Sequence, residues 1–136
     1  MKYLICFLLL FKGSLSISQN INSGNVLSQD ILVTYAGISN EGFLSTEVIK
    51  RTKFLSIKND SLDRYSIKSF NIGGCCLGSY VSYKIEGNKI KQEMIDFIVS
   101  CNDPKYIFII TKIILVDMIS NIEYEYGNDI TIHKKK

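Results

Sequence analysis

Hydrophobic and polar positions alternate through most of the second half of the chain. In the segment RYSIKSFNI, Tyr65 and Ile67 fall on one face of a predicted strand, and Phe70 and Ile72 fall on the other. Because successive strand residues point to opposite faces, this change of phase predicts a β-bulge near Ser69. The segment SYVSYKIEG alternates again, which predicts a neighbouring strand joined to the first across the glycine-rich residues 73–78.

A different period follows in the segment KIKQEMIDFIVSC, residues 89–101. Apolar residues recur there every three to four positions, which is typical of one buried helix face. The residues of this face are Ile90, Met94, Phe97, Ile98 and Cys101. Asn88 is a candidate N-cap, and Asn102 to Pro104 is expected to end the helix.

The remaining apolar segments predict further strands. Residues 106–119 are rich in β-branched residues and carry two charges, which favours a long central strand over a membrane span. Alternation on both sides of Gly127-Asn128 predicts a terminal β-hairpin over residues 122–132, and residues 30–36 suit a first strand. Residues 46–50 fit either helix or strand. Together these elements predict a mainly β fold: a small antiparallel, sandwich-like (Ig-like) domain with one crossover helix near residues 89–101.

The chain begins with features of a secretory signal. Lys2 precedes nine consecutive apolar residues, and small residues follow at positions suited to cleavage. A membrane helix needs about 20 apolar residues, and Lys12 interrupts the run well before that. We therefore expect residues 1–18 to be a signal peptide, with no stable membrane span after its removal and a periplasmic or secreted location. Residues 19–42 are expected to be a linker with a possible first strand.

Charge excludes one class of partner. The net charge of +3 falls to +1 once Lys2 and Lys12 are removed, and three of the remaining positive charges are the terminal lysines. A nucleic-acid-binding protein needs basic side chains concentrated on one face, so no nucleic-acid partner is expected. Residues 135–136 are expected to be a solvated basic tail with a frayed end.

No catalytic or cofactor-binding motif is present in the sequence, so no cofactor, metal site or enzymatic activity is predicted. The single histidine, His133, lies near the expected frayed end, where nothing would hold a general base in place. Three cysteines remain after signal removal: Cys75, Cys76 and Cys101. They leave three alternatives open: a disulfide from Cys75 or Cys76 to Cys101 with one buried thiol, three buried thiols, or a metal or redox site.

The order of segments from Leu62 onward resembles the C-terminal domain of the gliding-motility and type IX secretion protein GldM of Bacteroidetes. The resemblance rests on Ile67-Lys68-Ser69-Phe70 and on Gly87-Asn88-Lys89-Ile90 with the following Glu93-Met94, and it places the domain at residues 43–134. It implies a β-rich, non-catalytic module that makes protein contacts in the periplasm. The cysteines are not part of the family pattern, and GldM-like proteins carry a membrane helix and further domains.

The expected function is accordingly that of an exported protein-interaction module of the cell envelope, binding an envelope partner or itself through an exposed strand edge. Tyr124 and Tyr126 of the terminal hairpin are candidate anchors, with packing on the domain core as the alternative. The competing function is an envelope thiol-redox or small-ligand-binding protein that uses Cys75, Cys76 and Cys101.

Overall fold

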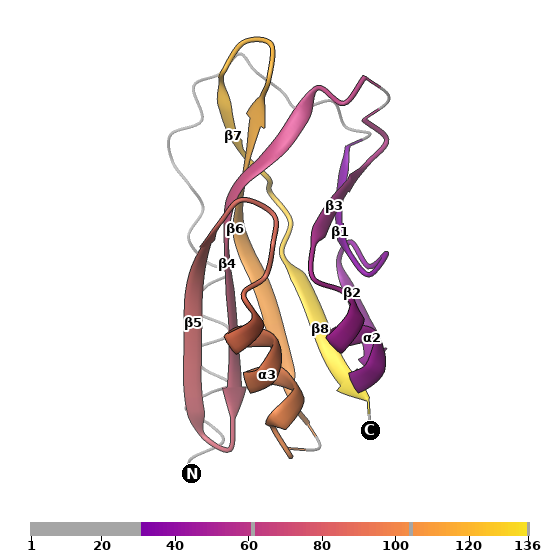
Figure 1. Cartoon of the computed structure of the whole chain (residues 1–136), viewed down its shortest axis with the longest axis vertical. Coiled ribbons are helices and arrows are strands. Elements are labelled where there is room, and N and C mark those ends of the chain that lie inside the picture. The colour runs from indigo at the N-terminus through magenta and orange to yellow at the C-terminus, as the bar shows by residue number, and fades with distance from the viewer. Residues whose placement is uncertain (1–30, 61, 104, 136) are drawn as a thin grey trace.

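A computed structural model describes residues 31–60, 62–103 and 105–135 of the chain (Figure 1). These residues form a mainly β domain with two helices, so the predicted fold class is confirmed. The expected signal peptide, residues 1–18, lies outside the described residues, as does most of the expected linker.

The larger of two sheets has the strand order β2-β8-β6-β4-β5, and β7 pairs with β6 as well. Its members are β2 (Glu41–Ser45), β4 (Tyr65–Cys76), β5 (Ser79–Glu86), β6 (Ile107–Asp117), β7 (Glu123–Glu125) and β8 (Ile130–Lys135). The long strand predicted over residues 106–119 is confirmed as β6, which lies between β4 and β8 (Figure 1). Most neighbours are antiparallel, but β2 and β8 are parallel, which the sequence pattern did not predict.

Two opposed bulges interrupt the pairing of β4 with β6. Ser69 pairs one position out of step with Ile67, and the original register returns at Asn71, opposite Thr111. One extra residue in β4 is therefore compensated by one extra residue in β6, where Lys112 has a φ of 49°. The bulge predicted near Ser69 is confirmed.

The bulge at Lys112 also explains the unbroken apolar run in β6. Phe108 and Ile110 are buried before it, and Ile113 and Leu115 are buried after it. Because the extra residue shifts the strand by one position, both pairs lie in the hydrophobic core although their spacing in the sequence changes.

A second layer packs on the large sheet. It contains α3 (Gln92–Ser100), α2 (Thr46–Arg51) and a small antiparallel sheet of β1 (Leu32–Tyr35) and β3 (Leu55–Lys58). Figure 1 shows both helices near the lower end of the sheet and the small sheet beside β8. The two layers share one core. Tyr35 connects them, because its ring meets Phe108 of β6 edge-on at 5.9 Å and its hydroxyl donates to the carbonyl of Thr52 at 3.0 Å.

The crossover helix is confirmed as α3, which is shorter than its predicted range. Met94, Ile95 and Ile98 are its buried residues. Asn88 does not cap it, because its side-chain amide donates instead to the carbonyl of Leu55 at 3.3 Å. A second helix is present as well: residues 46–50, where the pattern fitted either helix or strand, belong to α2, whose N-cap Ser45 accepts a hydrogen bond from the amide of Val48.

The glycine-rich segment after residue 72 is strand rather than loop. β4 continues through Gly73 and Gly74 to Cys76, and the connection to β5 is only Leu77-Gly78. Both turn residues have positive φ, 50° and 88°, as a type I′ hairpin requires. Gly74 is needed for close packing, because a β-carbon there would collide with the hydroxyl of Tyr106.

The predicted terminal hairpin is wrong. β7 pairs with β6, opposite Leu115, and β8 also pairs with β6, opposite Ile110 and its neighbours, so β7 and β8 are not partners of each other. The reversal occurs earlier, at residues 118–120 directly after β6. Gly127-Asn128 instead lies in the segment that carries the chain from β7 to β8 along the same side of β6.

Candidate functional site

The Cys76–Cys101 disulfide joins the end of the β4–β5 hairpin to the C-terminal end of α3. Its S–S distance is 2.00 Å and its Cα atoms are 5.9 Å apart. No free thiol occurs among the cysteines of the described ranges, so the predicted leftover thiol is not found. The described geometry therefore presents Cys76 and Cys101 as a link between two layers of the domain.

The two candidate tyrosine anchors pack within the domain. Tyr126 is buried, and Tyr124 is half-buried with its ring edge-on to Tyr65 at 6.2 Å. The structure places both along β6 rather than on an isolated hairpin. The contacts of Tyr124 and Tyr126 therefore agree with the alternative prediction, in which these tyrosines pack on the domain core.

β8 continues through Lys135, so the frayed end expected at residues 135–136 is wrong for Lys135. His133 lies in β8, and its Nε2 is 2.6 Å from a carboxylate oxygen of Glu41 in β2. Its ring stacks on Phe43 at 4.7 Å between ring centroids. These contacts hold the histidine at the β2–β8 side of the sheet.

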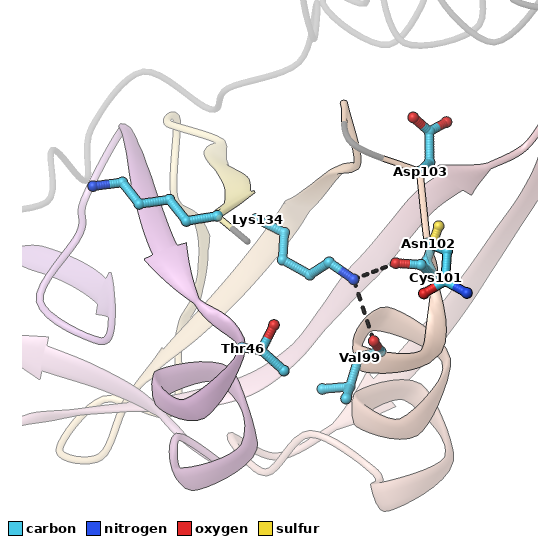
Figure 2. Close-up of a pocket in the computed structure, with 7 residues that line it drawn as sticks. Thr46, Val99, Cys101, Asn102, Asp103 and Lys134 are labelled. Atoms are coloured by element: carbon cyan, nitrogen blue, oxygen red, sulfur yellow. Dashed lines mark hydrogen bonds between the residues drawn. The ribbon is translucent and has the colours of Figure 1, made fainter.

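Lys134 ties the same strand to α3 beside a pocket of about 340 Å³ (Figure 2). Its ammonium donates to the carbonyls of Ile98 at 3.0 Å and Val99 at 3.2 Å, and also to the carbonyl of Cys101. These carbonyls lie at the helix end, where no intrahelical donor is available. Burial lowers the pKa of Lys134 from its ordinary value. Since the ammonium is already hydrogen-bonded to the carbonyls at the end of α3, Lys134 does not offer a free positive charge to a ligand in the pocket.

A fully buried carboxylate, Asp117, organises the turn after β6. One carboxylate oxygen accepts hydrogen bonds from Arg64 at 3.0 and 2.5 Å, and the other accepts from the amides of Ile119 and Ser120 at 2.9 and 3.3 Å. The Arg64 guanidinium, followed by these amides, holds the pKa of Asp117 well below its ordinary value. Every interaction stabilises the turn into β7, so this ionised group has a structural explanation.

Residues 31–60, 62–103 and 105–135 lack two further kinds of feature. They contain no cluster of three or more histidine, cysteine or carboxylate side chains that could hold a metal ion. They also contain no helix with the length and apolar character needed to cross a bilayer.

The feature that no side-chain pattern predicted is the outer edge of β5. β5 pairs with β4 over all eight of its residues without a register shift, from Cys76 opposite Ser79 to Ser69 opposite Glu86. A two-residue hairpin closes on a hydrogen-bonded pair, and such pairs then alternate along the ladder. The bond from the amide of Gly87 to the carbonyl of Lys68, at 2.6 Å, fits this alternation.

The alternation identifies the backbone groups that point away from β4. They belong to Tyr80, Ser82, Lys84 and Glu86, the residues between the hydrogen-bonded pairs. β5 lies at one end of the strand order, so in the described part of the chain no strand pairs with these groups. The edge therefore presents four N–H and four C=O groups in regular β spacing.

β5 lacks the usual protection of an exposed strand edge. It has no proline and no bulge, features with which natural proteins block edge-to-edge pairing. Its lysine, Lys84, is paired with Glu86 of the same strand at 3.1 Å. Tyr80 folds back over β4, since its hydroxyl oxygen is 2.5 Å from where a β-carbon on Gly73 would lie. The opposite edge strand, β2, has five residues against eight in β5.

Comparison of the chain with protein-family models and with curated protein sequences gave no match. The resemblance to the GldM C-terminal domain therefore stays a prediction.

Proposed function

We propose that the protein is an exported, non-enzymatic protein-interaction module of the cell envelope, similar in role to the C-terminal domain of GldM. Its binding element is the outer edge of β5. The observation that supports this proposal is the regular eight-residue edge strand whose outward backbone groups have no strand partner within the described residues. An extended segment of another chain adds to such an edge through main-chain hydrogen bonds.

The structure suggests why a rigid edge would serve this role. Cys76, the last residue of β4, is tied to α3 by the disulfide, and Ile85 near the other end of β5 is buried in the core. An edge held at both ends loses little conformational freedom when a partner strand binds, which favours affinity.

The edge can be blocked without removing a hydrogen bond of the fold. Ser82→Pro deletes one outward N–H, and proline is tolerated on edge strands when its missing N–H faces solvent. Ser82→Ala is the matched control, because it changes the side chain and keeps the donor. Circular dichroism and thermal melting would establish that both variants fold.

The test uses a photo-crosslinking residue at Tyr80 on β5, with a second placement at Leu32 in the small sheet as control, in cells that produce the protein. Adducts at position 80 that persist in Ser82→Ala and are lost in Ser82→Pro are expected. Adducts of equal yield at both positions, or adducts unaffected by Ser82→Pro, would contradict the proposal.

A further inference from the structure

We infer that the strand which binds the β5 edge is β5 of a second copy of this chain, in an antiparallel pair related by a two-fold axis. The inference rests on the proposed function, because it names the partner of the same edge. A two-fold axis makes the contact isologous, so each copy must offer both the donors and the acceptors that the other requires. The outward groups of β5 do so, since each of its four outward residues presents one N–H and one C=O.

Geometry selects one register for this pair. Outward residues must lie opposite outward residues, because only their backbone groups point across the new interface. If Ser82 lies opposite Lys84 of the second copy, Tyr80 lies opposite Glu86, and all four outward residues of each strand are paired. Shifting the register by two positions in either direction removes one pair from the end of the ladder.

Side chains favour the same register. Shifting toward the C-terminus places Lys84 opposite Lys84, and like charges directly opposite one another are destabilising. In the four-pair register, Lys84 lies opposite a serine and Glu86 opposite a tyrosine. Each Lys84 also retains its own Glu86, at 3.1 Å in the free domain. No like charges are therefore directly opposed.

The two-fold axis in this register passes beside Tyr83. Tyr83 is 40% exposed in the free domain, and in the pair the two Tyr83 rings lie directly opposite each other. This is a non-hydrogen-bonded position, where Cβ atoms are closest, and aromatic pairs across strands are stabilising. On the same face Val81 lies opposite Ile85, so the apolar row that faces α3 continues from one copy into the next.

The small net charge permits the association. The chain carries +3 in total, so two copies do not repel each other strongly at physiological ionic strength. Joining two β5 edges also gives one continuous sheet and covers both of the least protected edges at once.

Sedimentation equilibrium of the purified full chain tests the inference. The wild type and Ser82→Ala are expected to sediment with twice the chain mass. Ser82→Pro removes one interfacial hydrogen bond from each side and is expected to weaken self-association about 30-fold. Tyr83→Lys is a second variant, which places like charges on the axis and is likewise expected to weaken self-association.

Oxidation of a cysteine variant tests the register. Tyr83→Cys is expected to give a covalent dimer on a non-reducing gel, because the two Cβ atoms lie about 4.5–5.5 Å apart across the axis. Tyr80→Cys, which faces Glu86, and the wild type are controls expected to give none. Dimers from Tyr80→Cys but not from Tyr83→Cys would overturn the register.

The outcomes separate this inference from the proposed function. A monomeric wild type at its highest soluble concentration overturns self-association, while β5-dependent crosslinks to another protein would still support the interaction module. Dimers that persist in both Ser82→Pro and Tyr83→Lys would show that the copies meet through another surface and would also overturn the inference.

Discussion

Removing the Cys76–Cys101 disulfide offers a quantitative test of how the layers are held together. The two cysteines are 25 positions apart. A crosslink that closes a loop of this length lowers the entropy of the unfolded chain by about 12 cal/mol/K, which corresponds to about 3.5 kcal/mol of stability at 25 °C. The double variant Cys76→Ala/Cys101→Ala is expected to lose about this amount.

The loss is measured by urea denaturation followed by circular dichroism, together with thermal melting. For a folded region of roughly 100 residues, 3.5 kcal/mol corresponds to a decrease in Tm of about 15 °C. The single variants are the controls. Each one already breaks the same crosslink, so each is expected to lose nearly as much as the double variant.

Two results would refute this reasoning. A double variant that loses less than about 1 kcal/mol would mean that the crosslink adds little to the packing of α3 on the sheet. Single-variant losses that sum to the loss of the double variant would mean that the two sulfur atoms act as independent core side chains.

Three further predictions concern buried or partly buried polar groups. Asp117 has a lowered pKa in the folded state, so its contribution to stability is complete above its ordinary pKa of 3.8 and is lost as pH falls below that value. In Asp117→Asn the Tm is expected to be lower than in the wild type at neutral pH and to fall less steeply below about pH 4. Parallel curves of Tm against pH for the two proteins would refute this. Lys134→Met is expected to lower the free energy of unfolding, measured by urea denaturation, by about 1–3 kcal/mol, because three carbonyls at the helix end lose their donor. An unchanged midpoint of the urea curve would show that water replaces the amine without cost. The buried hydroxyl of Tyr106 has no hydrogen-bond partner in the described structure, so Tyr106→Phe is expected to leave stability unchanged or to raise it by about 1 kcal/mol. The methyl group added by Gly74→Ala collides with that hydroxyl, so Tyr106→Phe is also expected to relieve part of the destabilisation caused by Gly74→Ala. Additive effects of the two substitutions in the double variant would contradict this contact.

Elements defined by local patterns were predictable from the sequence. The three-to-four spacing around Met94 defines α3, and the β-branched run defines β6. The phase change near Ser69 was a reliable sign of a bulge, because side-chain alternation follows directly from strand geometry.

Pairing decisions were not predictable, because they depend on residues far apart in the chain. The alternation around Tyr124 and Ile130 is the same whether the two strands pair with each other or successively with β6. The buried carboxylate of Asp117 decides the matter by organising the earlier turn, and a lone aspartate in the sequence does not indicate such a role.

The β5 edge was missed for the same reason. The segment SYVSYKIE predicts a strand, but its place at the end of the sheet depends on which strands flank β4. One signal was present in the sequence: the segment has no proline, and its lysine and glutamate two positions apart can neutralise each other on one face.

The parallel contact of β2 with β8 has a consequence for how the chain acquires its structure. Glu41 and His133, which meet across it, are 92 positions apart, so β2 has no partner strand in its sheet until β8 is in place. Such a long closure is slow, and without β8 residues 107–110 of β6 would lack a strand partner on that side. Docking of β8 between β6 and β2, rather than any early local nucleus, is then the step that completes this sheet.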